Sequence, residues 1–434
     1  MLKRLLLINP WIFDFAAYNF WIRPLGLLRV AEFLSRFGLE LRMIDATDSF
    51  KLKRWGTGKF TTEVVEKPDI LKQIPFKYKK YGISYDDFRA KLKAVPAPDA
   101  VLVTSIMSYW YPGVQKVIEL IRDVLGGIPV ILGGIYSTLY YEHAVKNSGA
   151  DIVYQGCIDE RILRDLNFSI HYFLASESAK PYYKLNFYAS YPYAPLLTAY
   201  GCPFNCSYCA SSLLSQGYRR FEIDDILREI FELAQRGVRD FAFYDDALLY
   251  DSSSHIKPLL KEILKRKLGV RFHTPNGLHA RFVDAELARL MKETNFKTIR
   301  LSLETIDDAR LKGTGDKVSI EDIKRAVLLL KKQGFTKKEL GVYLMYGLPG
   351  QSLEEVMKGI EFLKSLKVNI NLTEYSPIKG TRSWADLVSR GVIDEGLDPL
   401  LTNNTVFPLL YSGYNKFQLD DMKLDIKKYN ARIE

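Results

Sequence analysis

The chain has 434 residues, 47% of them hydrophobic and 26% charged, with a formal net charge of +10. This length predicts about two or three domains, and the composition, with only four cysteines, excludes a disordered chain, a collagen-like chain and a disulfide scaffold. The first apolar run is too short for a secretory signal or a membrane span, so we expect a cytoplasmic protein without a membrane span.

Short apolar runs alternate with amphipathic stretches in the first third of the chain, a pattern typical of strands that cross over through helices into a parallel sheet. We therefore predict a Rossmann-like α/β domain over residues 1–156. Apolar residues recur at intervals of three and four residues in its predicted helices. The predicted elements are helices 25–37 and 113–125 and strands 5–9, 41–45, 100–105, 129–134 and 152–154. Ligands of such sheets bind beyond the carboxyl ends of the strands.

A basic segment, residues 51–93, interrupts this alternation between the second and third strands. It holds twelve Lys/Arg and five Asp/Glu residues, and it is too long for an ordinary loop, so we expect a lid or an inserted subdomain. Because much of the positive charge is local, we expect no nucleic-acid partner. The segment either attracts an acidic or phosphorylated metabolite or is a solvated, lysine-rich surface.

Residues 157–193 are rich in tyrosine and lack clear periodicity, so we predict a connector. Alternation resumes over residues 194–385, which predicts a partial (β/α)6 barrel with its site on the loops after the strands. Residues 386–434 resemble none of this and are predicted to cap one end. The predicted barrel strands are 196–200, 241–244, 270–274, 298–304, 341–346 and 369–374, and the helical patterns are 222–235, 284–293, 320–332 and 353–366.

Three cysteines, Cys202, Cys206 and Cys209, lie within eight residues at the end of the first strand of this series. A tight loop can bring their sulfurs to one side, and soft sulfur ligands suit zinc or an iron–sulfur cluster. A closed zinc site needs a fourth ligand, which no nearby Cys or His supplies, whereas a cluster can use an open iron. A zinc knuckle or redox-inert thiols are the alternatives. Cys157 lies outside the motif and is interpreted as a buried small residue.

The spacing Cys202-x3-Cys206-x2-Cys209, with Tyr208 just before the last cysteine, resembles the signature of the radical S-adenosylmethionine (SAM) superfamily. The resemblance covers about residues 190–385. It implies that the cysteines hold a [4Fe-4S] cluster, that SAM chelates the fourth iron through its amino and carboxylate groups, and that Tyr208 lies at the SAM site. An open iron fits the chemistry, because reductive cleavage of a sulfonium needs an electron delivered by direct contact.

The same resemblance implies SAM contacts after three later strands. Tyr244, Asp245 and Asp246 occupy the place of the loop that binds the methionine ammonium, for which a carboxylate is a suitable acceptor; a helix N-cap is the alternative for either aspartate. Ser302 and Glu304 share one face of the fourth strand and match groups that bind the ribose and carboxylate, with a solvated strand end as the alternative for Glu304. Gly347 lies in the segment near adenine, where glycine permits close backbone approach.

A Rossmann-like domain before such a barrel resembles the cobalamin-binding subclass of this superfamily. For Tyr109, packing between domains is the alternative to contact with the corrin. The domain lacks the Asp-x-His-x-x-Gly signature of an axial histidine, and no histidine precedes His143, so we expect water or a non-coordinating side chain at the lower face of cobalamin. A domain without cobalamin is the alternative. The cobalamin-binding candidates are Asn9, Leu25, Gly26, Ser105, Tyr109, Gly133 and Gly134.

These resemblances imply an enzyme that cleaves SAM reductively to a 5′-deoxyadenosyl radical, which takes a hydrogen atom from an unactivated carbon of a small-molecule substrate. Methyl transfer from methylcobalamin is the expected outcome; rearrangement, oxidation and carbon–carbon bond formation are alternatives. The expected partner is a reductant such as flavodoxin or ferredoxin. A non-catalytic corrinoid or iron–sulfur sensor is the alternative of another class.

Two histidines are candidates for an acid or base. His273 and His279 flank Asn276-Gly277 after a predicted barrel strand, and imidazole titrates near neutral pH. We expect Asn276-Gly277 and residues 377–381 to line the substrate side of the barrel.

Overall fold

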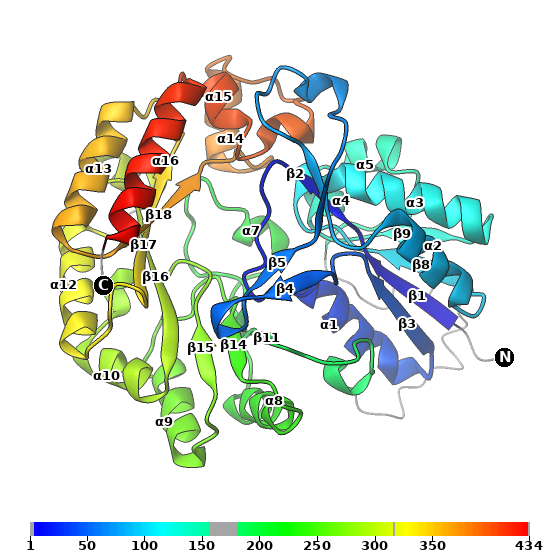
Figure 1. Ribbon diagram of the computed structural model, residues 1–434, viewed down its shortest axis with the longest axis horizontal. Helices are drawn as coiled ribbons and strands as arrows, with labels where there is room; N and C mark the ends of the chain where they lie inside the picture. The colour runs from blue at the N-terminus through cyan, green and yellow to red at the C-terminus, as the bar shows by residue number, and fades with distance from the viewer. Residues whose placement is uncertain (1–3, 157–179, 316, 433–434) are drawn as a thin grey trace. The chain divides into compact units, whose positions relative to one another are not determined.

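The computed structural model describes residues 4–156, 180–315 and 317–432 (Figure 1). The chain divides into two compact units: an amino-terminal unit, residues 1–190 with 398–401, and a barrel unit, residues 191–397 with 402–434. None of the helices in the described ranges combines the length and apolar character that a membrane span requires. Cys157, predicted to be a buried small residue, lies outside these ranges.

A five-stranded parallel sheet forms the centre of the amino-terminal unit, in the order β10-β9-β8-β1-β3. The β1 residues Leu5 to Ile8 are almost completely buried, as expected of a strand that helices cover on both faces. Chain order reverses between β1 and β8, and ligands of doubly wound sheets bind at such switch points. The strands are β1 Arg4–Asn9, β3 Glu40–Asp45, β8 Ala100–Val103, β9 Val130–Leu132 and β10 Ile152–Val153.

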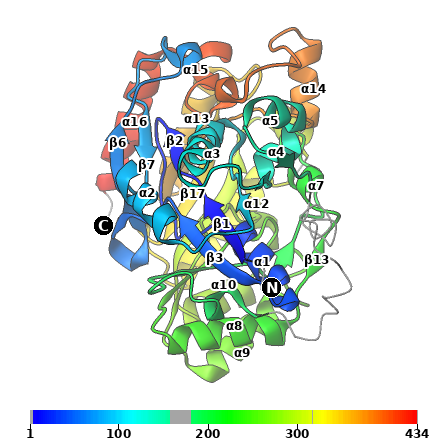
Figure 2. The ribbon, with the colours of Figure 1, turned by 90° about the vertical axis from the view of Figure 1, so that its right-hand side faces the viewer.

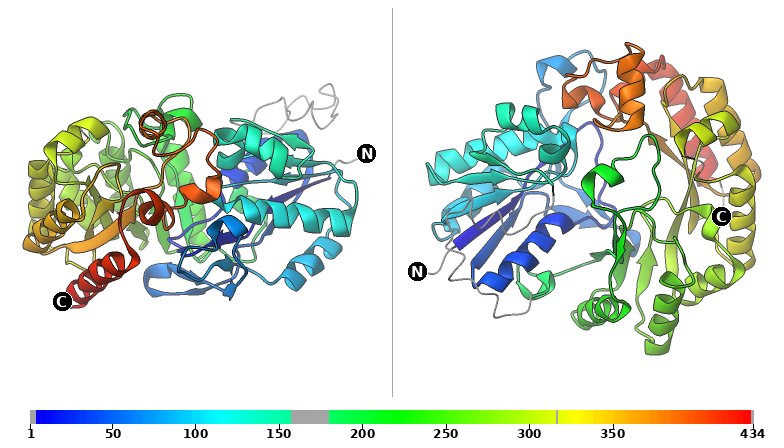
Figure 3. Two further views of the ribbon diagram at one scale, coloured as in Figure 1. Left: turned by 90° about the horizontal axis from the view of Figure 1, so that it is seen from above. Right: turned by 180° about the vertical axis from the view of Figure 1, so that it is seen from behind.

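Two helices cover opposite faces of this sheet (Figure 3). Helix α1 (Leu25–Leu34) packs Leu27 and Ala31 against Leu7 of β1. Helix α3 (Tyr111–Leu125) connects β8 to β9. Since the β1–β3 and β8–β9 connections run in opposite directions along the sheet, right-handed crossovers place their helices on different faces. The shorter helices α4 (Ile135–Leu139) and α5 (Tyr141–Asn147) follow β9.

The basic segment 51–93 folds into small antiparallel sheets and one helix. Strand β7 pairs with β2, which follows β1 directly, and with β6. The Tyr78 hydroxyl donates to the Phe13 carbonyl at 3.2 Å, which ties the segment to β2. The segment therefore has the character of an inserted subdomain. Its elements are β4 Phe50–Leu52, β5 Gly58–Phe60, β6 Thr62–Val64, β7 Lys79–Tyr81 and α2 Tyr85–Ala94, and β2 is Ile12–Asp14.

The barrel unit contains six parallel strands that pair in chain order, β11-β14-β15-β16-β17-β18, with β11 and β18 at the two edges. Helices lie along the outer face of the curved sheet (Figure 1). The predicted partial (β/α)6 barrel is thus present. Its strands are β11 Ala194–Leu196, β14 Asp240–Phe243, β15 Arg271–His273, β16 Phe296–Glu304, β17 Leu340–Tyr346 and β18 Asn369–Glu374, and its helices are α8 Ile223–Gln235, α9 Ile256–Arg266, α10 Ala285–Glu293, α12 Ile320–Lys332 and α13 Leu353–Ser365.

The predicted strand 196–200 is wrong as a single element. It divides into β11 and β12 (Ala199–Tyr200), and β12 pairs with β13 (Arg219–Arg220) outside the barrel sheet. The cause is the Asp245 carboxylate, whose Oδ1 accepts hydrogen bonds from the Thr198 N–H, the Thr198 hydroxyl and the Ala199 N–H at 2.7–2.8 Å. These bonds turn the chain between the two short strands.

The carboxyl-terminal residues cover the β18 edge of the barrel. The Asn430 side chain on α16 (Lys416–Ala431) bonds both the N–H and the carbonyl of Ile370, at 3.0 and 2.8 Å, and so occupies groups that an edge strand would otherwise expose. Figure 2 shows α16 and α13 in the same part of the unit. Helices α14 (Arg382–Ser389) and α15 (Phe407–Tyr411) precede α16.

Candidate functional site

The three cysteines lie on the loop that follows β12, which we call the cluster loop (residues 201–209). The loop begins with Gly201 at φ +73°, where an added Cβ would lie 2.1 Å from the Gly217 carbonyl oxygen, so only glycine fits. Cys206 is buried, and Cys202 and Cys209 are half-buried. The Cys209 N–H bonds the Cys206 carbonyl at 3.2 Å, closing a turn between these two ligand candidates.

The start of α14 holds the outer side of the cluster loop. The Ser383 N–H donates to the Ser207 carbonyl at 2.8 Å, and the Arg382 guanidinium donates to the Asn205 carbonyl. Residues after β18, the last barrel strand, therefore support a loop that follows β12 near the start of the barrel. The predicted substrate-side segment 377–381 leads into this contact, and Thr381 caps α14.

The donor set of the cluster loop fits an iron–sulfur cluster. No three His, Cys, Asp or Glu side chains in the described part of the chain lie close enough to share a single metal ion. A four-iron cube binds each thiolate through a different iron, so its three sulfurs need not converge on one ion. Burial raises the pKa of the Cys202 thiol to about 11, and cluster binding would have to displace its proton.

Tyr208, Glu304 and Lys317 form a hydrogen-bonded group beside Cys206. Lys317 Nζ donates to Glu304 Oε1 at 2.9 Å, with 15% of the lysine and 8% of the glutamate side chain exposed. The Tyr208 hydroxyl also bonds Glu304, and burial, followed by the charge of Glu304, raises the tyrosine pKa. Glu304 adopts φ +68° at the end of β16, which is uncommon outside glycine. The predicted SAM residues Tyr208 and Glu304 therefore lie together.

Sequence reasoning did not single out Lys317, whose charge offsets this buried carboxylate. Burial alone would lower the lysine pKa, but Glu304, Cys206 and Cys209 together raise it above its usual value. Gly315 leaves room for the contact with the cluster loop, because a Cβ there would lie 3.1 Å from Cys206 Cα. No spacing pattern links residue 317 to the cysteines, so only the fold brings them together.

The two aspartates after β14 lie in different environments. Asp245 is buried and bonded to Thr198 and Ala199, and burial raises its pKa to about 6. Asp246 is exposed and accepts from the Ser211 hydroxyl at 2.7 Å, and Ser211 in turn lies 3.5 Å from Cys209 Sγ. Of this pair, Asp246 is the carboxylate beside the cluster loop. The carbonyl of Tyr244, the third candidate in this loop, accepts from Asn276 Nδ2 at 2.9 Å.

Ser302 packs against Gly277, and Gly347 packs against the carboxyl-terminal region. A Cβ on Gly277 would lie 2.0 Å from Ser302 Oγ, so glycine is required for this contact. At Gly347 (φ +86°), a Cβ would lie 3.0 Å from Pro408 Cγ, and the Gly347 carbonyl accepts from Ser412 at 2.9 Å. The close backbone approach predicted at Gly347 is thus made by this chain's own residues around α15.

His273, one of the two acid–base candidates, lies inside the barrel wall. Its side chain is fully buried, with Nε2 at 3.0 Å from Asp240 Oδ1 and Nδ1 at 3.1 Å from Thr298 Oγ1. Both nitrogens are therefore occupied within the barrel wall. His279 is buried against the Phe204 ring at 4.6 Å between centroids. Burial, with lesser contributions from Lys317 and Arg281, lowers the pKa of His279 to about 3.

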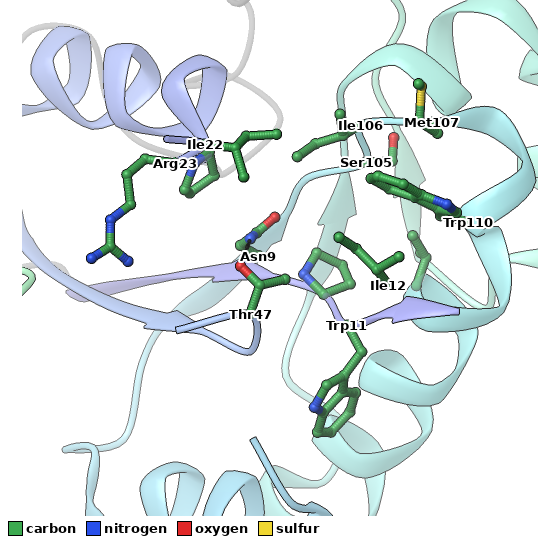
Figure 4. A pocket seen from close by; sticks show the side chains of 13 residues that line it. Asn9, Trp11, Ile12, Ile22, Arg23, Thr47, Ser105, Ile106, Met107 and Trp110 are labelled. Carbon is green, nitrogen blue, oxygen red and sulfur yellow. Dashed lines mark hydrogen bonds between the residues drawn. The ribbon is translucent and has the colours of Figure 1, made fainter. Parts of the chain in front are cut away.

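A pocket lies within the amino-terminal unit, at the carboxyl ends of β1 and β8 where the topology switches (Figure 4). Figure 4 shows Asn9, Thr47, Ile22 and Ser105 around the same space. No histidine lines it. The lining residues are Asn9, Pro10, Trp11, Ile12, Ile22, Arg23, Pro24, Thr47, Ser105, Ile106, Met107, Trp110 and Val114.

Two of the cobalamin-binding candidates, Asn9 and Ser105, line this pocket, whereas Leu25, Gly26, Tyr109, Gly133 and Gly134 do not. Gly134 acts indirectly. At φ +101° it lets Ser105 approach, because a Cβ there would lie 2.4 Å from the Ser105 carbonyl oxygen. The Ser105 hydroxyl then donates to the Gly133 carbonyl at 2.9 Å and so joins the loops after β8 and β9.

A buried polar network fixes the opposite wall of the pocket. Asp45 Oδ1 accepts from Asn9 Nδ2 at 2.7 Å, and Asp45 Oδ2 accepts from the Tyr188 hydroxyl at 2.7 Å. The Arg23 guanidinium donates to Asp48 Oδ1 at 2.6 Å and lies 4.0 Å from the centroid of the Tyr188 ring. Asp45, Asp48 and Tyr188 were not predicted as site residues, since Tyr188 lies far from the two aspartates in the sequence.

Residues 196–363 match the family model of the Radical SAM superfamily. This chain carries a radical SAM domain. The match begins in β11 and contains the cluster loop, Glu304 and Gly347, which are the features that the sequence motif predicts for such a domain.

Two curated relatives are similar to this chain. An uncharacterized methyltransferase, PH0819, of Pyrococcus horikoshii is 25% identical over 243 residues, 52% of this chain and 52% of the relative. The cytidylyl-2-hydroxyethylphosphonate methyltransferase of Streptomyces wedmorensis is 21% identical, over 86% of this chain and 79% of the relative. The chain thus spans about half the length of the first of these relatives and most of the second.

Among solved structures, the radical SAM methyltransferase TsrM of Kitasatospora setae, with cobalamin and a [4Fe-4S] cluster bound, superposes with a TM-score of 0.65 at 18% identity. The superposition covers 90% of this chain and 78% of TsrM. At this identity the likeness shows the fold. The predicted Rossmann-like domain followed by a radical SAM barrel is therefore confirmed, while the roles of individual residues stay predictions.

Proposed function

We propose that the protein is a cobalamin-dependent radical SAM enzyme that transfers a methyl group to an unactivated carbon of a small-molecule substrate. The observation that carries this proposal is the cluster loop, in which three cysteines lie at the mouth of a radical SAM barrel beside a buried Glu304–Lys317 pair. The printed names of the two curated relatives and of TsrM, all of them methyltransferases, support methyl transfer as the reaction class.

In this proposal, Cys202, Cys206 and Cys209 hold a [4Fe-4S] cluster and leave one iron to SAM. Glu304 and Asp246 present carboxylates on either side of the loop, at the end of β16 and after β14, for the hydroxyl and ammonium groups of SAM. Lys317 fixes the Glu304 carboxylate, and Tyr208 donates to it. When bound, the cluster supplies the low-potential electron for reductive cleavage of SAM, and cobalamin supplies the methyl group.

The pocket of the amino-terminal unit is the proposed site for part of the cobalamin, with its nucleotide tail between the loops after β1 and β8. The small side chains of Asn9, Thr47 and Ser105 fit a polar ligand, and Ile12 and Ile22 add apolar contact. Because no histidine lines the pocket, we expect the lower face of cobalamin to meet water or a non-coordinating side chain. A reductant such as flavodoxin or ferredoxin completes the proposal.

The experiment is anaerobic reconstitution of the cluster on protein purified from cells supplied with hydroxocobalamin. We expect a cobalamin absorbance spectrum and, with dithionite and SAM, 5′-deoxyadenosine. An intact cluster that yields no 5′-deoxyadenosine would favour a non-catalytic sensor. Cleavage of SAM without bound cobalamin would keep the radical enzyme and remove methylcobalamin from its mechanism.

A further inference from the structure

Arg300 lies on the inward face of β16, on the same side of the strand as Ser302, before the register with β17 shifts between Ser302 and Glu304. The alternate residues Ile299, Leu301 and Leu303 are completely buried on the other face, towards α10 and α12. Figure 1 shows these helices on the outer side of the sheet. Since side chains alternate along a strand, Arg300 points to the interior side of the barrel, as Ser302 does.

The neighbouring strands are adapted to this arginine. Arg300 is paired with Gly341 of β17, and a Cβ at Gly341 would lie 3.1 Å from both Cδ and Nη1 of Arg300. The same Cβ would lie 2.5 Å from Asn371 Oδ1 on β18, a buried oxygen without a hydrogen-bond partner among the described residues. A glycine on β17 thus makes room for the guanidinium and brings an amide beside it.

Arg300 has no carboxylate partner in the described part of the chain. Its Nη1 donates to two backbone carbonyls, those of Ile299 at 2.9 Å and Glu339 at 3.4 Å. The nearby acids are committed elsewhere: Asp240 pairs with Arg271 and His273, and the Glu339 carboxylate accepts from Lys292. Burial holds the pKa of Arg300 below its usual value, opposed by Tyr343.

A partly buried guanidinium without a counter-charge is costly, because removing a charge from water is compensated only by a paired opposite charge. The other inward groups of β16 to β18 near it are neutral, namely Ser302, Tyr343 and Asn371, and the Tyr343 hydroxyl donates to the Pro275 carbonyl at 2.7 Å. The Nε and Nη2 donors of Arg300 remain available for a planar, two-oxygen acceptor.

We propose that Arg300 is the residue that recognises the substrate, and that the substrate carries an anionic oxygen group, a carboxylate or a phosphate-like group, which pairs with its guanidinium inside the barrel. This inference rests on the proposed function for the existence of a substrate, and it adds the substrate's chemical class. Asn371 is the adjacent positioning residue, supplying an amide to the same group.

The test is calorimetric titration of the cluster-loaded protein with methylphosphonate, inorganic phosphate, acetate and, as a neutral counterpart of acetate, acetamide. We expect at least one of the anions to bind and acetamide not to bind. The Arg300→Gln substitution should lower the affinity for that anion at least tenfold. Arg300→Lys keeps the positive charge but lacks the planar pair of guanidinium donors, so its affinity should lie between those of the wild type and Arg300→Gln. Arg289→Gln, which removes an exposed arginine paired with Glu293, is the matched control and should bind as the wild type does.

Which anion binds tells a phosphate-like group from a carboxylate. The inference is overturned if no anion binds the wild type, or if Arg300→Gln binds it with unchanged affinity. If Arg300→Gln does not fold, the affinity of Arg300→Lys is the test. An affinity of Arg300→Lys equal to that of the wild type for every probe would contradict recognition by the guanidinium. SAM cleavage is measured on the wild type alone, so its absence counts against the proposed function and not against Arg300.

Discussion

The cluster loop takes its three cysteines from eight consecutive residues, whereas the pocket of the amino-terminal unit is lined by residues scattered from Asn9 to Val114. In the loop, a local turn and one glycine set the positions of the ligands. In the pocket, the shape depends on a topological switch, a glycine that backs Ser105 and a network that reaches Tyr188. The difference teaches that spacing along the chain reveals a site only when the site is local.

Cys206→Ala tests the local side of this comparison and has the largest expected effect. Loss of one of three thiolates should abolish cluster assembly and SAM cleavage while the amino-terminal unit still binds cobalamin, because the two sites lie in separately packed units. Iron analysis, the 5′-deoxyadenosine assay and the cobalamin spectrum measure the three quantities. Cys157→Ala is the matched control and should keep all of them. Retained SAM cleavage in Cys206→Ala would contradict the ligand assignment.

Glu304→Ala tests the part of the barrel site that only the fold assembles. Removing the carboxylate leaves the Lys317 ammonium without its partner, which should cost about 3–5 kcal/mol of unfolding free energy and weaken SAM binding at least tenfold. Denaturant unfolding and SAM titration measure these effects. Glu321→Ala breaks an exposed pair with Lys324 and should change stability by less than about 1 kcal/mol. Unaltered SAM affinity in Glu304→Ala would remove Glu304 from the site.

Gly134→Ala addresses the non-local pocket. The added Cβ would lie 2.4 Å from the Ser105 backbone, at a residue with positive φ. We therefore expect the free energy of unfolding to decrease by about 1–3 kcal/mol. Cobalamin binding should decrease, and the iron content should stay normal. Gly133→Ala, whose Cβ would meet no atom within 4 Å, is the matched control for stability. Equal stability of the two variants would show that the Gly134–Ser105 contact does not hold the pocket.

His279→Phe gives the smallest effect, and its sign depends on pH. The folded-state pKa of His279, about 3, lies below the unfolded value of about 6.5. The stabilisation of the folded protein by the neutral imidazole is therefore present above pH 6.5 and is lost as the pH falls. When the pH falls from 7.5 to 5.5, the free energy of unfolding of the wild type should decrease by about 1.4 kcal/mol more than that of the variant. Urea unfolding at the two pH values measures this, and parallel losses in both proteins would contradict a buried neutral imidazole against Phe204.

Much of the fold could be predicted because apolar periodicity is a local signal. Strand 369–374 and helix 320–332 were predicted to the residue, since turn signals bound both. The break between β11 and β12 could not be predicted, because it depends on a hydrogen bond to Asp245, which lies far along the chain. Hydrogen-bonded partners distant in sequence leave no spacing to detect.

The candidate site divides in the same way. The cysteines, Tyr208 and Glu304 were predicted from motifs, and the structure brings the last two together. No sequence pattern pointed to Lys317, whereas Arg300 could have been noticed because it alternates with Ser302 on one strand face. For His273, the sequence does not reveal that Asp240 and Thr298 bond both of its ring nitrogens.

The most direct test of the account is electron paramagnetic resonance of the reduced, reconstituted protein before and after addition of SAM, together with metal analysis. The account predicts four irons per chain and a signal that changes when SAM reaches the iron that no cysteine holds. Zinc in place of iron, or a cluster signal that SAM leaves unchanged, would contradict it.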